Sequence, residues 1–154
     1  MKNQRYKPLN LDFEKFFSGK VIAKGNLMLK YPKKSVKNLH VTFKGSFKNN
    51  NLKLSEQYLE NNDKVVREWN FRKLSKNLFY GKEKSVKGKI VVHINRNMLT
   101  MQYRFKLILW KFTTIVLIKD YMYLINEKEI VNTTYVSKLG INLAKIVLLY
   151  KKIS

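Results

Sequence analysis

The chain has 154 residues, a length that suits one domain with a core of useful size. Hydrophobic residues make up 45% of it and aromatic residues 13%, which excludes an intrinsically disordered chain despite a formal net charge of +22. Cysteine is absent, which excludes disulfides, thiolate metal sites and cysteine nucleophiles.

The start of the chain is predicted to be an arm and one helical turn. We expect residues 1–154 to form a single domain, with residues 1–12 as an N-terminal arm and residues 13–154 as its β-barrel. Within 11–17, the string LDFEKFF could form one turn of helix before Gly19. No apolar segment typical of a signal peptide lies in residues 1–11.

From Gly19 onward, apolar and polar residues alternate with a period of two, which predicts strands. Asparagine-rich strings separate them, because Asn tolerates the left-handed conformation of tight turns. The last predicted strand also fits helical spacing. The expected strands are 20–31, 39–47, 52–60, 63–73, 78–81, 86–94, 99–109, 114–125, 130–136 and 141–150. Many short strands at regular spacing predict an all-β sandwich or barrel.

The clearest register is that of segments 52–60 and 63–73, joined by Asn61-Asn62 as a two-residue hairpin loop. Pairing across this loop places Glu56 opposite Arg67 and Leu54 opposite Trp69, on a face that is otherwise apolar. A slip of one residue would destroy this sorting. The inward charge pair is interpreted either as a structural bridge or as an anchor for the polar end of a ligand. Trp69 is interpreted as core or as a stacking platform.

A second charge pair is expected in the apolar region 99–125, where both strand faces are hydrophobic. A turn at residues 110–112 would place Asp120 opposite Arg104. The two-sided hydrophobicity predicts a covered stretch or a patch that faces a membrane.

Metal and cofactor chemistry finds little support in the sequence. His40 and His93 are predicted to lie on outward strand faces, far from other ligands. Motifs for nucleotide binding, serine hydrolases and zinc proteases are missing. We therefore expect no cofactor, no metal and no catalytic residue that the sequence alone identifies.

The positive charge comes from 27 lysines and only 5 arginines, spread along the chain. An A/T-rich genome would explain it, since its codons also favour Asn, Ile, Phe and Tyr. Attraction to anionic lipid headgroups is the second interpretation, for which the lysine-rich segments 30–37 and 82–89 are candidates. Binding to nucleic acid is the weakest interpretation, because proteins that recognise base sequence rely on arginine for bidentate contacts.

Several short motifs resemble a bacterial family catalogued as domain of unknown function 3833. They are Phe16-Phe17-x-Gly19, Leu54-x-Glu56-Gln57-Tyr58, Arg67-x-Trp69, Asp120-Tyr121-Met122-Tyr123-Leu124, Asn132 and Ser137-Lys138-x-Gly140. Tyr121 stands where the family usually has Trp. The resemblance implies a lipocalin-like, up-and-down antiparallel barrel of nine or ten strands, with no established reaction. It also implies a link to membrane lipid metabolism, since members tend to occur with genes for fatty-acid modification.

Members of the family are often described as lipoproteins of the cell envelope. Because the chain shows neither a signal peptide nor a cysteine for lipidation, we expect a location in the cytoplasm or at the periphery of the inner membrane. No run reaches the roughly 18–20 uncharged residues that a spanning helix needs.

The sequence favours a non-enzymatic barrel that binds a lipid, a fatty-acyl compound or another apolar ligand, with lysines facing an anionic membrane. The alternatives are a lipid-modifying enzyme that uses Glu56 or Asp120, a structural envelope protein with a filled interior, and a nucleic-acid binder. The oligomeric state is left open. The candidate ligand-binding residues of the interior are Glu56, Arg67, Trp69, Tyr103, Asp120, Tyr123, Asn132 and Lys138.

Overall fold

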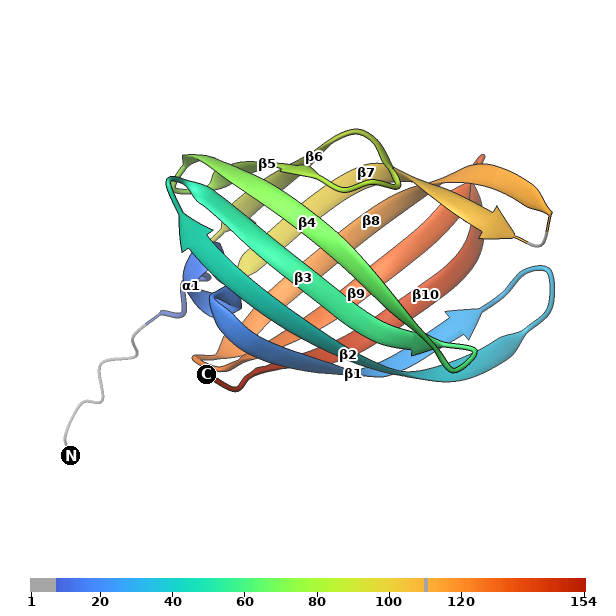
Figure 1. The fold of residues 1–154 in the computed structure, drawn as a ribbon, viewed down its shortest axis with the longest axis horizontal. Helices are drawn as coiled ribbons and strands as arrows, with labels where there is room; N and C mark the ends of the chain where they lie inside the picture. The colour runs from blue at the N-terminus through green and yellow to red at the C-terminus, as the bar shows by residue number, and fades with distance from the viewer. Residues whose placement is uncertain (1–7, 110) are drawn as a thin grey trace.

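A short helix followed by ten antiparallel strands makes up the computed structural model, which describes residues 8–109 and 111–154 (Figure 1). The elements are α1 (Phe13–Phe17), β1 (Gly19–Leu29), β2 (Ser35–Lys48), β3 (Asn51–Glu60), β4 (Asp63–Ser75), β5 (Leu78–Lys82), β6 (Val86–Asn95), β7 (Met98–Leu109), β8 (Phe112–Asn126), β9 (Glu129–Lys138) and β10 (Ile141–Lys152). Each strand pairs with the next along the chain, and β1 pairs with β10 to close a barrel. The predicted all-β, up-and-down barrel is confirmed.

The predicted register of β3 and β4 is also confirmed: Glu56 lies opposite Arg67 and Leu54 opposite Trp69. Asn61 and Asn62, which form the turn, both have positive φ angles, of 50° and 66°. A two-residue turn with two positive φ angles matches the twist of the strands that it joins, and Asn tolerates it better than most residues.

Two other expectations are resolved at the ends of the chain. The final segment is the strand β10, not a helix, because it pairs with both β9 and β1 and completes the ring. The helical turn near Gly19 is α1, which is capped by Asp12 through a hydrogen bond of 3.1 Å from the Lys15 backbone N–H. Residues 1–7 of the predicted arm lie outside the described residues, so its boundary at residue 12 stays a prediction.

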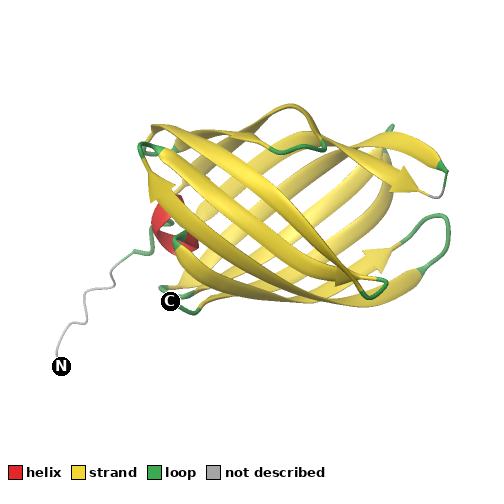
Figure 2. Ribbon diagram, viewed as in Figure 1, coloured by secondary structure: helices red, strands yellow, loops and turns green. Residues whose placement is uncertain are grey.

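Helix α1 closes one end of the barrel (Figure 2). The ring of Phe13 meets Phe71 and Phe79 edge-on, with 5.1 Å between ring centroids in each case. The rings of Phe17 and Tyr150 also meet edge-on, with 5.9 Å between their centroids. Such edge-to-face pairs stabilise a core beyond the burial of their area. The helix is therefore an aromatic plug.

The opposite end of the barrel carries the hairpins β1–β2, β3–β4, β7–β8 and β9–β10, and no helix of the described residues lies across it (Figure 1). The two ends of the barrel therefore differ: one is sealed by phenylalanine rings, and the other is formed by hairpin tips. Among the residues that the structure describes, no helix is long and apolar enough to cross a membrane.

The outer wall around β8 is partly apolar, as the two-sided hydrophobicity of segment 99–125 predicts. Ile115 and Leu117 are partly exposed there, and Tyr123 and Ile125 are exposed. The predicted outward position of both histidines is confirmed, since His40 and His93 are exposed.

Candidate functional site

The barrel encloses a cavity of about 990 Å³ that reaches from the plug to the open end. Ligand pockets in proteins typically measure about 300–1,000 Å³ and have mostly apolar walls. Near the open end the walls are aliphatic and aromatic, and they include Leu27, Leu29, Leu39, Phe105, Leu107 and Leu143. At the sealed end the lining includes Phe13, Phe17, Phe43 and Phe71.

Polar side chains face the cavity between these two apolar regions. Glu56 projects from the middle of β3, and its Oε2 atom accepts a hydrogen bond of 2.7 Å from Nε1 of Trp69. Burial raises the pKa of Glu56 above its ordinary value, although the Trp69 hydrogen bond and the charge of Arg67 oppose this rise. The carboxyl group is therefore easier to protonate than one in water.

Arg67 does not form the predicted bridge to Glu56, although the two residues are neighbours in the ladder. Its Nη1 atom lies 3.5 Å from Oε1 of Glu83, and the guanidinium also donates to Tyr58 and Ser85. Glu83 precedes β6 in the turn after the short strand β5, and its side chain is almost fully buried. The β5–β6 turn thus supplies the partner of Arg67, which the strand register could not predict.

Asp120 is the centre of a second polar group that lines the cavity. Its Oδ1 atom accepts hydrogen bonds from Nδ2 of Asn132 and from Oγ1 of Thr134, the latter at 2.8 Å. Tyr150 joins them by donating to Oδ1 of Asn132 at 3.3 Å. Burial raises the pKa of Asp120, and these hydrogen bonds oppose the rise.

The predicted pairing of Asp120 with Arg104 is wrong. Leu109 pairs with Phe112 across the β7–β8 turn, so Asp120 lies opposite Met101 and Arg104 lies opposite Leu117. The side chain of Arg104 is exposed on the outside of the barrel. Part of the predicted turn falls on residue 110, which lies outside the described residues.

The two carboxyl groups and the nearby phenols influence one another electrostatically. Burial raises the pKa of Tyr103 well above its ordinary value, and the charges of Asp120 and Glu56 add to this rise. The same two carboxylates raise the pKa of Tyr150, after its burial. Trp69 and Tyr103 meet edge-on with 5.9 Å between ring centroids. Glu56, Tyr103, Asp120 and Tyr150 all line the cavity, and we call them the polar belt.

Seven of the eight residues predicted for the interior line the cavity: Glu56, Arg67, Trp69, Tyr103, Asp120, Asn132 and Lys138. The prediction is wrong for Tyr123, because alternation along β8 turns Asp120 and Met122 inward and leaves Tyr123 exposed outside. Lys138 lies at the open end, away from the polar belt, and donates to the backbone carbonyl of Ile115.

Sequence reasoning missed Glu83, Thr134 and Tyr150. Thr134 had a usable signal, since it lies two residues after Asn132 and must share its strand face. Glu83 had none, because its position depends on the path of a turn.

The charged groups that line the cavity differ between its interior and its mouth. The polar belt holds the carboxyl groups of Glu56 and Asp120, while the nearby guanidinium of Arg67 is paired with Glu83. Lys37, Lys138 and Glu60 line the cavity near its mouth. The interior therefore offers acidic and neutral hydrogen-bonding groups, and the entrance offers two lysines beside one glutamate.

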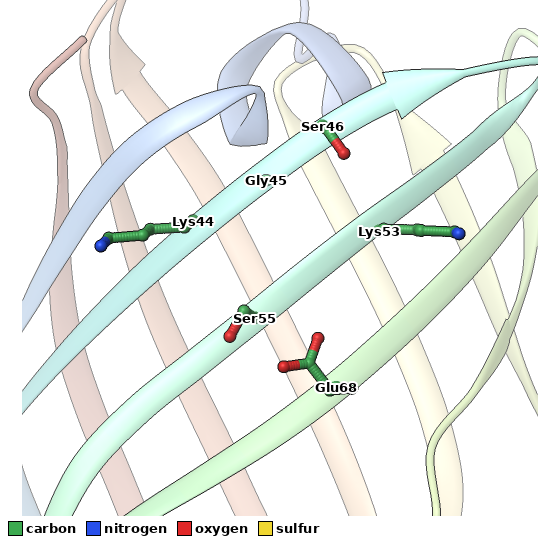
Figure 3. Close-up of a pocket in the computed structure, with 6 residues that line it drawn as sticks. All are labelled: Lys44, Gly45, Ser46, Lys53, Ser55 and Glu68. Atoms are coloured by element: carbon green, nitrogen blue, oxygen red, sulfur yellow. The ribbon is translucent and has the colours of Figure 1, made fainter.

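A second, shallower depression of about 280 Å³ lies on the outer face of β2, β3 and β4. Figure 3 shows that its lining side chains come from these three adjacent strands and that Lys44 and Lys53 extend away from each other. The lining is Lys44, Gly45, Ser46, Lys53, Ser55 and Glu68. It lacks the apolar walls that would hold a ligand, so the barrel cavity is the stronger candidate.

Metal binding has no support in the part of the chain that the structure describes, where no group of three or more His, Asp or Glu side chains is arranged to hold an ion. The expectation that the chain holds no metal stays a prediction.

Comparisons with known proteins identify the family and the fold. The family model described as "Protein of unknown function (DUF3833)" matches residues 1–152, so the chain belongs to this family. No curated protein matches the sequence significantly. Among solved structures, the crystal structure of Rv2717c from M. tuberculosis is similar, with a TM-score of 0.58 and 10% sequence identity, over 90% of this chain and 93% of the other. At this identity the likeness shows a shared fold alone.

Proposed function

We propose that this member of the DUF3833 family binds an apolar molecule with one polar end, such as a lipid or fatty-acyl compound, inside its barrel. The observation that carries the proposal is the cavity of about 990 Å³, with apolar walls above a buried polar belt. A protein with a purely structural role would have no need for such an interior, because a filled core is more stable than a hollow one.

The apolar walls would supply most of the affinity. Each methylene that leaves water for such a surface contributes about 0.8 kcal/mol. The upper cavity offers Leu27, Leu29, Leu107 and Leu143 as contacts for such a chain. Within a series of straight-chain compounds, each added methylene should tighten binding by roughly threefold to fourfold until the cavity is filled.

The polar belt would select the other end of the ligand. An ionised carboxylate beside Glu56 and Asp120 would be repelled by like charge. A hydroxyl, amide or amine group can instead donate hydrogen bonds to these carboxyl groups, and an ester can accept one from the hydroxyl of Tyr103. We therefore favour a neutral or cationic polar end over a free fatty acid bound with its carboxylate inward.

A second candidate is a lipid-modifying enzyme, which the raised pKa values of Glu56 and Asp120 favour. Buried carboxyl groups with raised pKa values are typical of general acids and bases. If this candidate is right, Glu56→Gln or Asp120→Asn should abolish turnover of a bound lipid while the barrel still binds it.

The test of binding uses native mass spectrometry of the purified protein and titration with the neutral fluorescent probe N-phenyl-1-naphthylamine. Ala144 is buried and lines the cavity, so Ala144→Trp should occupy the space and abolish probe binding. The matched control is Gln102→Trp, which adds the same ring on the exposed outer face of β7. Equal probe binding by both variants, with no co-purified lipid, would overturn the proposal.

A further inference from the structure

Among the side chains that the structure describes, the most exposed apolar ones gather at one end of the barrel. Seven large hydrophobic residues of this set are 58–93% exposed, and all of them lie on or beside the hairpin tips of the open end. We call them the mouth rim: Tyr31, Val36, Leu59, Ile108, Phe112, Leu139 and Ile141. The other exposed large hydrophobic residues of the described chain are only 38–55% exposed.

The mouth rim is continuous with the cavity. Tyr31, Leu59, Ile108 and Phe112 line the cavity as well as being exposed to solvent. Exposed apolar side chains that surround the entrance to an apolar cavity are unfavourable in water, and such patches usually mark an interaction surface. The surface at this end is thus joined to the proposed ligand site.

Cations surround the mouth rim. Exposed lysines on the same hairpins include Lys33, Lys34, Lys37, Lys64, Lys111 and Lys138. The acidic residues beside these tips are Glu60 and Asp63. Lysines also occur over the rest of the barrel, so charge alone does not select an end; the apolar tips do.

The combination of apolar tips and lysines indicates which kind of partner the mouth rim would bind. A second copy of the chain placed mouth to mouth would bring the two sets of lysines together, and like charges would oppose the contact. An anionic bilayer instead accepts apolar side chains at the boundary of its acyl chains and attracts lysines to its headgroups.

From this arrangement we infer that the mouth rim docks the barrel, open end first, on an anionic lipid surface. The seven apolar side chains enter the interface, the lysines contact the headgroups, and the cavity opens directly toward the acyl chains. The inference rests on the proposed function only for the role of docking, which is to let the ligand pass between bilayer and cavity without crossing water.

The experiment measures co-sedimentation of the full chain with vesicles of phosphatidylcholine and phosphatidylglycerol in equal parts, and with vesicles of phosphatidylcholine alone. The test variant, Val36→Thr, Leu139→Asn and Ile141→Thr, changes rim residues that do not line the cavity. Asn is chosen at 139 because Leu139 has a positive φ of 49°. The matched control, Tyr123→Thr, Ile125→Thr and Ile153→Thr, changes three exposed apolar residues away from the rim.

We expect the native chain to bind the anionic vesicles and to bind the neutral vesicles much more weakly. The rim variant should bind the anionic vesicles roughly tenfold more weakly or worse, because it removes inserted side chains. The control variant should bind like the native chain. Docking is overturned if the native chain ignores anionic vesicles, or if both variants behave alike.

Binding of N-phenyl-1-naphthylamine without vesicles separates the two proposals. Probe binding without rim-dependent docking would sink this inference and leave ligand binding intact. Docking that depends on the rim in a protein that binds no probe or lipid would support this inference and sink the proposed function.

Discussion

Trp69 and Glu56 meet inside the barrel, where the indole Nε1 donates a hydrogen bond of 2.7 Å to Oε2 of the carboxylate. The Trp69 ring is also stacked on Phe71, with 6.3 Å between centroids. Trp69 therefore packs toward the sealed end of the barrel and also donates a hydrogen bond to the buried carboxyl group of Glu56. Burial raises the pKa of Glu56, and the Trp69 hydrogen bond opposes this rise by stabilising the ionised form of the carboxyl group.

Trp69→Phe removes this donor and keeps an aromatic ring. We expect the pKa of Glu56 to rise further and the protein to lose about 2 kcal/mol of stability at pH 8, since hydrogen bonds to charged groups contribute about 1.5–3 kcal/mol. The loss should be smaller at pH 4, where Glu56 is more protonated. Urea unfolding at both pH values measures it. In a Glu56→Gln background the effect of Trp69→Phe should not depend on pH, and a dependence there would contradict the explanation.

The part of the fold that local pattern determines could be predicted from the sequence. Alternation along 52–60 and 63–73 together with Asn61-Asn62 leaves one register in which the apolar residues share a face, and the structure has it. The order of the strands follows from short turns, because each hairpin pairs neighbours along the chain.

What depends on turn lengths and on distant elements could not be predicted. In the β7–β8 pair Asp120 lies opposite Met101 and not opposite Arg104, and the path of the β5–β6 turn brings Glu83 to Arg67. The cavity could not be predicted either, because apolar and polar side chains alternate in the same way in a filled barrel and in a hollow one. The cavity results from ten strands around a ring with a plug at one end only.

The second prediction concerns Asp120, whose pKa is raised by burial. For a carboxyl group with a folded-state pKa above its unfolded value, the favourable contribution is fully present below the unfolded pKa. It is lost as pH rises through the folded pKa. Asp120→Asn keeps an oxygen acceptor for Thr134 and removes the buried charge. The variant should therefore be more stable than the native chain at pH 8, and the difference should shrink as pH falls toward 4.

Thermal unfolding at a series of pH values measures this difference. In a chain of this size, a change of about 1 kcal/mol in the free energy of unfolding shifts the Tm by roughly 2–4 °C. Asp63→Asn is the control, because it makes the same change of charge at an exposed turn. An equal shift for both variants, or a difference that grows toward low pH, would refute the assignment.

The third prediction concerns the pair of Arg67 and Glu83. Arg67→Met leaves the nearly buried Glu83 carboxylate without its cation, and we expect a loss of about 3 kcal/mol. Adding Glu83→Gln to this variant removes the unpaired charge and should recover part of the loss. Chemical unfolding of the single and double variants gives the coupling energy. Strict additivity of the two changes would show that the residues do not interact. Arg104→Met, at an exposed arginine on the outer face, should change stability little.

The last prediction distinguishes two glycines that are needed for different reasons. A Cβ atom on Gly45 would lie 1.9 Å from the backbone carbonyl oxygen of Phe17, at the end of α1. Gly140 has open space around the Cβ position but a positive φ of 78°. At Gly45 the obstacle is the plug itself, and at Gly140 it is only the backbone conformation.

Gly45→Ala should therefore displace α1 and cost about 3 kcal/mol, at the upper end of the range for overpacking. Gly140→Ala should cost about 1 kcal/mol, which is the left-handed penalty of an ordinary residue. Asn separates the causes: Gly140→Asn should restore nearly full stability, because Asn tolerates a positive φ, whereas Gly45→Asn should be at least as harmful as Ala. Urea unfolding of the four variants tests this order. Rescue by Asn at 45 would mean that α1 does not press against β2, and the sealed end of the barrel would have to be explained in another way.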